Sequence, residues 1–237
     1  CDFEIHFFST FACPPSSSEN ENYHKLLGEL KPMRDRVPAK ELSDLSALLQ
    51  RDLSDERIAQ ELLPYLSGTF SKVGFFPPIL AVLVPSGFIH QTGKKVQYPL
   101  GRNTNRGGIE YENYWRIDFH PGSTRLARLS IYETTEIIVL DGQHRTNAFR
   151  YAAGVLTPDS LHEIFYADVT KPKQFSADLP VTIAWFSPRA KNEVRPVDIS
   201  RELFVAVNNN AKPVSSSRTI LLDDKHPVPL AVNSYYG

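Results

Sequence analysis

Cysteine is scarce in this chain: Cys1 and Cys13 are the only two among 237 residues, and both lie within the first thirteen positions. So few cysteines exclude a disulfide framework, and the absence of a C-x-x-C spacing excludes a cysteine-rich zinc site. We therefore expect a reducing, cytoplasmic compartment.

Long apolar runs are missing as well. No stretch approaches the ~18 apolar residues of a membrane-spanning helix, and no basic region followed by an apolar run opens the sequence. We expect no membrane association. The sequence begins with Cys1 rather than methionine and ends at Gly237 without a helix stop, so we expect it to be part of a longer protein.

Neither sign of charge is in excess, because 26 lysines and arginines face 27 acidic residues and the net charge is −1. Without a global positive field, any nucleic acid must bind through a local patch. The chain also lacks a Walker lysine, an H-E-x-x-H pair and a Rossmann glycine triplet. With 12 glycines and 18 prolines, its loops are stiffened by proline.

What the sequence does contain is a series of short apolar segments separated by turn residues. Strands are predicted over residues 3–8, 73–89 with a turn at 85–87, 96–100, 111–119, 126–131, 137–140 and 179–186. Helices are predicted over 42–66, with a second part beginning at Ser54, from just after Leu140 to a stop at Gly154, and over 197–207 and 215–222. The fold class is α+β, and no internal repeat is visible.

Three regions are expected along the chain. Residues 1–41 form a strand and loop appendage, residues 42–69 form leading helices, and residues 70–237 form the main domain. The length of 237 residues fits one large domain or two small ones.

The most informative segment runs from Ile137 to Phe149, with the sequence IIVLDGQHRTNAF. Four consecutive apolar residues predict a strand buried on both faces, and a helix begins directly after it. Unpaired backbone N–H groups and the helix dipole favour an anion such as phosphate at this place.

The polar side chains of this turn suit such a ligand. His144 and Arg145 lie four residues before the apolar stripe of the helix and should point into a crevice above the sheet. Arg145 can offer a bidentate fork to phosphate or carboxylate, and His144 can donate, accept or transfer a proton near neutral pH. Gly142 allows close approach, and Asp141 can bind a cation or orient His144. An N-cap, a turn glycine and a surface ion pair remain the alternative.

Basic residues gather between Lys94 and Arg128, where seven face three acidic ones. Arginines with interleaved aromatic residues predict a surface that binds nucleic-acid phosphates. The candidate DNA contacts are Arg102, Arg106, Arg125 and Arg128. The alternative is that these charges protect edge strands from pairing.

The run Asp141-Gly142-Gln143-His144-Arg145 resembles the signature of the DGQHR-domain family, which includes DndB-like proteins of DNA-modification and defence loci. Phe75-Phe76-Pro77-Pro78-Ile79 is similar to the proline-bearing strand that precedes this motif in the family. The segment from Leu203 to Val214, with Asn208 and Lys212, is similar to its later phenylalanine–asparagine segment. On their own, the asparagines of that segment would be a helix cap and turn before Pro213.

The resemblance implies a ParB/sulfiredoxin-like fold, a mixed sheet with flanking helices whose strand-to-helix turn binds nucleotide phosphates. It implies ATP, or another NTP, with Mg²⁺ as ligands. The implied nucleotide contacts are Gly142, Gln143, His144, Arg145, Asn208 and Lys212. Asp141 becomes the metal ligand, and Asp141 with His144 the catalytic pair if the nucleotide is hydrolysed. No cysteine lies near Gln143, which argues against sulfinic-acid reduction.

The expected function is therefore a nucleotide-binding accessory protein of a DNA-modification or antiphage system, with NTP hydrolysis left open. The alternative is a non-catalytic DNA-binding regulator that keeps the turn as scaffold, and a third possibility is an enzyme that modifies a base or the backbone. Expected partners are DNA, other proteins of the same locus and further copies of this chain.

Overall fold

The structure is a computed structural model that describes residues 3–14, 21–32, 54–67, 76–86, 98–105, 107–157, 163–169 and 177–188, with five single positions: 175, 199, 202, 203 and 206. The chain divides into two compact units, Cys1–Glu202 and Leu203–Gly237. Every helix and strand named below belongs to the first unit. Its elements form a mixed α+β arrangement with two sheets, which confirms the predicted fold class.

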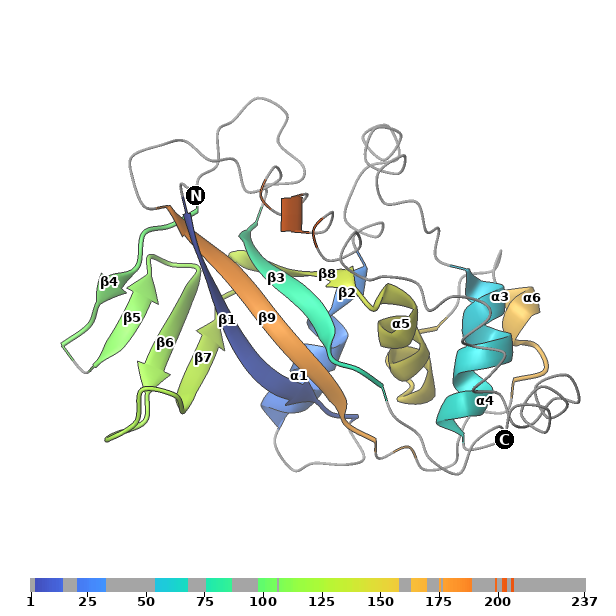
Figure 1. The fold of residues 1–237 in the computed structure, drawn as a ribbon. Helices are drawn as coiled ribbons and strands as arrows, with labels where there is room; N and C mark the ends of the chain where they lie inside the picture. The colour runs from blue at the N-terminus through green and yellow to red at the C-terminus, as the bar shows by residue number, and fades with distance from the viewer. Residues whose placement is uncertain are drawn as a thin grey trace, which may run out of the picture. The chain divides into compact units, whose positions relative to one another are not determined.

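A five-stranded sheet, sheet A, forms the centre of the first unit (Figure 1). Its strands are, in spatial order, β1 (Phe3–Ala12), β9 (Leu179–Pro188), β3 (Ile79–Pro85), β8 (Thr135–Asp141) and β2 (Lys31–Pro32). β3 runs parallel to β9 and antiparallel to β8, while β1 is antiparallel to β9 and β2 parallel to β8. The sheet is therefore mixed.

The two inner strands that carry the predicted motifs are buried on both faces. Residues 81–84 of β3 and 137–140 of β8 are all buried. Continuous apolar runs without alternation are what such strands require. The strand predicted over 137–140 is confirmed. β3 finds its partners in β8 and β9, and the predicted hairpin-like return after Pro85 falls largely on residues outside the described ones.

β1 is an integral edge strand of sheet A and not an appendage. It pairs with β9 along all ten of its residues, from Phe3 opposite Pro188 to Ala12 opposite Leu179. A pairing between segments so far apart in the chain leaves no local signal in the sequence, which is why residues 1–41 looked detached.

A second, four-stranded antiparallel sheet, sheet B, consists of β4 (Arg102–Asn103), β5 (Gly108–Tyr111), β6 (Trp115–Phe119) and β7 (Ala127–Ile131) in that order. The single strand predicted over 111–119 is wrong, because residues 112–114 form a turn in which Glu112 adopts a φ of 51°. This turn contains neither glycine nor proline; Asn113 is its one residue of a type common in turns, and the strand prediction overlooked it. Residues 98–100, predicted as strand, are not in a strand.

Aromatic side chains connect the two sheets. The rings of Tyr111 and Trp115 in sheet B stack with centroids 5.3 Å apart, and Tyr111 lies 6.0 Å from Trp185 of β9. Tyr98 contacts Phe186, the next residue of β9, at 5.3 Å. Both tryptophans are buried, and among the described residues neither indole Nε1–H has a hydrogen-bond partner. Apolar burial therefore holds this junction together, at the cost of two unpaired donors.

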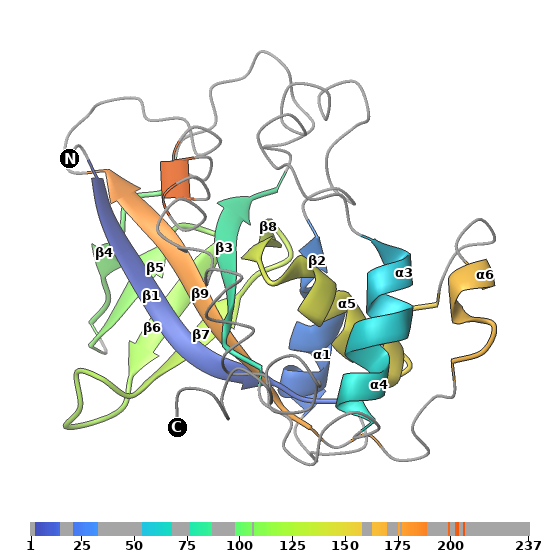
Figure 2. The same cartoon turned by 45° about the vertical axis from the view of Figure 1, so that its right-hand side comes forward.

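The helices of the first unit are α1 (Glu21–Glu29), α3 (Asp55–Arg57), the π-helical turn η2 (Ile58–Leu62), α4 (Leu63–Leu66), α5 (Gln143–Ala152) and α6 (Glu163–Tyr166). α3, η2 and α4 follow one another without a break and are called helical segment 55–66. α5 packs against this segment and against β2 and β3 (Figure 2). Ser54 caps the segment by accepting the Arg57 N–H at 3.2 Å, which confirms the predicted helix start.

α5 also ends as predicted. Gly154 adopts a left-handed φ of 73°, and the Val155 N–H bonds back to the Arg150 carbonyl at 2.8 Å. The helices predicted over 42–53, 197–207 and 215–222 lie outside the described residues apart from isolated positions. Within the described ranges, no helix has the length and apolarity needed to cross a membrane.

His6 on β1 is a titratable group in the aromatic junction. Its ring stacks on Trp185, its cross-strand partner, with centroids 5.6 Å apart. Burial lowers the pKa of His6, and the Glu4 carboxylate, 3.9 Å from Nε2, opposes this only in part.

A lowered histidine pKa makes the folded state bind fewer protons than the unfolded state. The part of the folding stability that depends on neutral His6 is therefore fully present above pH 6.5, the ordinary histidine pKa. It is lost as the pH falls below 6.5 and through the lowered pKa that His6 has in the folded state. We expect His6→Gln to flatten the rise of the urea midpoint with pH below that value. His120→Gln, at an exposed turn histidine, controls for loss of a histidine as such, and an unaltered slope in His6→Gln would contradict the assignment.

Candidate functional site at the strand-to-helix turn

The strand-to-helix turn, residues 141–145, joins β8 to α5 with a single residue between them. Gly142 is the N-cap, with φ 85° and ψ 22°, and as a glycine it has no side chain to cap this helix end. The first intrahelical hydrogen bond runs from the Thr146 N–H to the Gly142 carbonyl at 2.9 Å. The backbone N–H groups of residues 143–145 precede that bond and form the positive end of the helix dipole.

Only glycine fits at position 142. Its φ lies in the left-handed region that side chains disfavour. A Cβ there would also lie 2.7 Å from Cγ2 of Ile79 and 3.0 Å from Nη2 of Arg145. The turn therefore approaches β3 and the arginine more closely than any other residue would permit.

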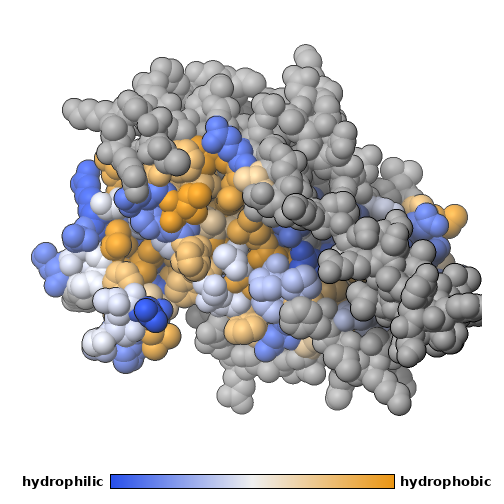
Figure 3. All heavy atoms as spheres, in the orientation of Figure 1, coloured by the Kyte–Doolittle hydropathy of each residue, from blue (hydrophilic) through white to orange (hydrophobic). Residues whose placement is uncertain are grey.

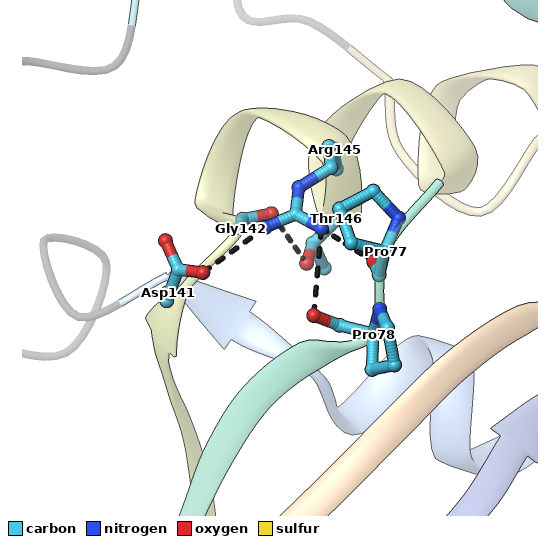
Figure 4. A network of polar contacts seen from close by, with 6 residues as sticks. All are labelled: Pro77, Pro78, Asp141, Gly142, Arg145 and Thr146. Atoms are coloured by element: carbon cyan, nitrogen blue, oxygen red, sulfur yellow. Dashed lines mark hydrogen bonds and ion pairs between the residues drawn. The ribbon is translucent and has the colours of Figure 1, made fainter. Parts of the chain in front are cut away.

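Arg145 connects three segments of the chain (Figure 4). Its Nη2 donates to Oδ2 of Asp141 at 3.1 Å, and its Nη1 donates to the Pro77 carbonyl and, at 3.4 Å, to the Pro78 carbonyl. The side chain is only 17% exposed. The guanidinium thus ties the end of β8 and the first turn of α5 to the residues that lead into β3.

This arrangement changes the role expected for Arg145. The sequence predicted a fork for phosphate or carboxylate, with a surface ion pair as the alternative. In the structure both terminal nitrogens donate within the protein, one of them to the Asp141 carboxylate. Asp141 uses one oxygen for Arg145 and is 44% exposed. Within the described part of the chain, its Oδ1 has no hydrogen-bond partner, and Figure 4 shows that oxygen directed away from the guanidinium.

His144 also makes a hydrogen bond that stabilises the fold. Its Nε2 accepts the backbone N–H of Ser54 at 3.1 Å, so that nitrogen carries a lone pair in this state. Because Ser54 caps helical segment 55–66, His144 fastens that segment to the strand-to-helix turn. The proton-transfer role of His144 stays a prediction.

The first turns of α5 contain buried polar groups that sequence reasoning missed. Thr146, Asn147 and Arg150 are all buried. Thr146 Oγ1 donates to the Gly142 carbonyl at 3.0 Å, and Arg150 Nη1 donates to Asn147 Oδ1 at 3.3 Å. The apolar stripe of α5 predicted which face of the helix is buried. It did not predict that Thr146, Asn147 and Arg150 extend that buried face.

Three further residues were predicted as nucleotide contacts: Gln143, Asn208 and Lys212. Gln143 lies in the first turn of α5 and is half-buried. Asn208 and Lys212 lie outside the described residues, so their approach to the turn stays a prediction. The contacts of Ser54, Pro77 and Pro78 were not foreseen. The last two belong to a segment that resembled a family block, which was the one available signal.

The predicted DNA surface corresponds to sheet B and its loops. Arg102 lies on β4 and Arg128 on β7, at opposite edges of the sheet. Arg125 precedes β7, and all three are exposed, whereas Arg106 lies outside the described residues. The structure therefore places Arg102 at one edge of sheet B and Arg128 at the other.

Opposite charges alternate across the polar face of sheet B. Arg102 and Arg116 both flank Glu110 in the pairing register, and Arg128 is opposite Asp118. The Arg116 side chain also donates to Asp118 at 2.8 and 2.6 Å, and this hydrogen bond raises the pKa of Arg116. Such cross-strand pairs place acidic side chains next to Arg102, Arg116 and Arg128, and the excess of seven basic over three acidic residues along this segment is unchanged.

One groove of about 450 Å³ lies at the β6–β7 end of sheet B. It is lined by Arg116, Asp118, Phe119, His120, Pro121, Leu126, Ala127 and Arg128. No residue of the strand-to-helix turn contributes to it. Across the described residues, no group of three or more histidine, cysteine, aspartate or glutamate side chains forms a metal site.

No family model matches this chain, and no curated protein or solved structure matches it at a significant level. The resemblance to the DGQHR-domain family therefore stays a prediction from residues 75–79, 141–145 and 203–214.

Substituting Gly142 tests the close approach at the turn. Gly142→Ala should lower the free energy of unfolding by about 2 kcal/mol or more, since a left-handed residue costs ~1–2 kcal/mol and the Ile79 clash adds to it. Gly154→Ala is the matched control, because its φ is 73° with nothing within 4 Å of the added carbon. Equal losses in urea unfolding would contradict the steric argument.

A second prediction compares two arginines with the same i,i+4 spacing to an acidic partner, Arg145 with Asp141 and Arg57 with Glu61. Arg145→Ala should cost about 2 kcal/mol, because backbone carbonyls lose a charged donor. Arg57→Ala, in an exposed pair, should cost less than about 0.5 kcal/mol. Thermal or urea unfolding measures both, and similar values would show that the Pro77 and Pro78 contacts contribute little.

Proposed function

We propose that the strand-to-helix turn binds the phosphates of a nucleotide, ATP or another NTP together with Mg²⁺. The chain would act as a nucleotide-binding accessory protein of a DNA-modification or antiphage system. The observation that supports this most is the start of α5 behind a glycine N-cap that admits no side chain, next to a half-exposed carboxylate. Helix N-termini of this kind suit phosphate oxygens.

The roles of the residues follow from their contacts. The backbone N–H groups of residues 143–145 take phosphate oxygens. Arg145 acts as a positioning residue, because its guanidinium holds the turn in place and lends positive charge from behind. His144 supports the same geometry through Ser54.

Asp141 can bind the magnesium ion through its carboxylate. Mg²⁺ is commonly bound through one or two carboxylates, with water and substrate phosphates completing the shell. One carboxylate with a second oxygen directed away from its arginine fits that requirement when phosphate is present. Magnesium would neutralise negative charge on the phosphates. Because the chain lacks a Walker lysine, Arg145 would otherwise be the residue that neutralises this charge.

The sequence resemblance supports the same proposal. Two of the three family-like blocks, residues 75–79 and 141–145, are joined by the Arg145 hydrogen bonds to Pro77 and Pro78. A ParB/sulfiredoxin-like fold is part of the proposal, supported by the mixed sheet in which β8 leads directly into α5. If the nucleotide is hydrolysed, His144 or Asp141 would position the water; His144 Nε2 accepts the Ser54 N–H in this structure, and hydrolysis stays a prediction.

Calorimetric titration with ATP, CTP and GTP, each with and without magnesium, tests the proposal. We expect at least one nucleotide to bind more tightly with Mg²⁺. Asp141→Asn should abolish that gain, a loss of about ten- to a hundredfold for one charged interaction. Asp118→Asn, a carboxylate of sheet B, is the control and should retain it.

Absence of binding by all three nucleotides to the folded wild-type chain would overturn the proposal. Titration with duplex DNA at several salt concentrations then tests the alternative, a DNA-binding regulator. In that case the double change Arg125→Ala and Arg128→Ala should lower the slope of log K against log salt by about two, one per phosphate contact.

A further inference from the structure

β1 has an open edge. It occupies one end of sheet A, and among the described residues no strand pairs with its outer side. Natural proteins protect such edges with short strands, lysine, proline or bulges. β1 has ten residues and contains no lysine, arginine or proline. Its pairing with β9 is continuous, whereas the β3–β8 pairing carries a register shift.

One face of β1 is apolar and exposed. Ile5, Phe7 and Phe11 alternate along the strand, share one face, and are 51%, 71% and 53% exposed. Figure 3 shows hydrophobic side chains gathered on the side of the molecule along which β1 runs. Phenylalanines in such numbers are uncommon on a strand that remains in water.

The strand is complementary to itself. In an antiparallel pair related by a two-fold axis at Phe7, that residue faces its own copy, and Phe3 faces Phe11 at both ends. Ile5 then faces Ser9. The single charged residue, Glu4, faces Thr10, so no like charges meet. Aromatic cross-strand pairs are among the favourable ones in antiparallel sheets.

We propose that two copies of this chain associate through β1, which pairs antiparallel with β1 of the second copy about a two-fold axis at Phe7. The pairing continues sheet A from one copy into the other and satisfies the open edge of both. The interface is isologous, so it closes at two copies and does not propagate.

Sedimentation or light scattering across a concentration series tests the proposal. The wild-type chain should be a dimer. Phe7→Lys should raise the dimer dissociation constant at least tenfold, because it brings two positive charges together on the axis. The exposure of Phe7 means that the monomer fold should persist, and circular dichroism checks this. Ile164→Lys on α6, 77% exposed, is the matched control and should leave the dimer intact.

Cysteine cross-linking then tests the register, on a Cys1→Ser background. Directly opposite residues lie ~4.5–5.5 Å apart at Cα, within the range that a disulfide bridges. Phe7→Cys should therefore cross-link under mild oxidation, Ser9→Cys alone should not, and Ile5→Cys with Ser9→Cys should. A monomeric wild type, a dimer unaffected by Phe7→Lys, or failure of Phe7→Cys to cross-link would each overturn the proposal, whatever the outcome of the nucleotide titrations.

Discussion

The hydrogen bonds of the Arg145 guanidinium are the interaction on which the strand-to-helix turn depends. Pro77 and Pro78 have no backbone N–H, so this stretch offers carbonyl acceptors without donors of its own. Arg145 supplies the missing donor and at the same time pairs with Asp141. Because the guanidinium lies close behind Gly142, the glycine, the two prolines and the ion pair form one interdependent arrangement.

In the site that we propose, a ligand meets backbone N–H groups and the Asp141 carboxylate rather than the Arg145 guanidinium. Arg145 and His144 both contact the fold, one at the entry to β3 and the other at the start of helical segment 55–66. Donors fixed by a helix need no reorganisation when an anion arrives, whereas long side chains would lose rotamer freedom. A turn held in place by the side chains of Arg145 and His144, with a helix N-terminus and the Asp141 carboxylate beside it, is consistent with phosphate recognition.

The sequence predicted those parts of the fold whose cause is local. The apolar run 137–140, the glycine after it and the Ser54 cap each act within a few residues, and each is confirmed. The misjudged features are non-local. Arg145 and Pro77 are 68 residues apart, and a backbone carbonyl is invisible in a pattern of side chains. For the same reason, the charge count over residues 94–128 included Glu110 and Asp118 but did not show that sheet B places them opposite Arg102 and Arg128.

Sheet A separates the two sites that we propose. The turn lies at the end of β8, whereas the open edge belongs to β1, and β9 and β3 stand between them. Three strand spacings amount to roughly 14 Å, and the intervening strands are densely packed. β9 also carries Trp185 and Phe186 into the aromatic junction with sheet B, so it is fixed from both sides. A rigid strand in that position transmits little displacement, and a nucleotide at the turn and a second copy at β1 should therefore bind independently of each other.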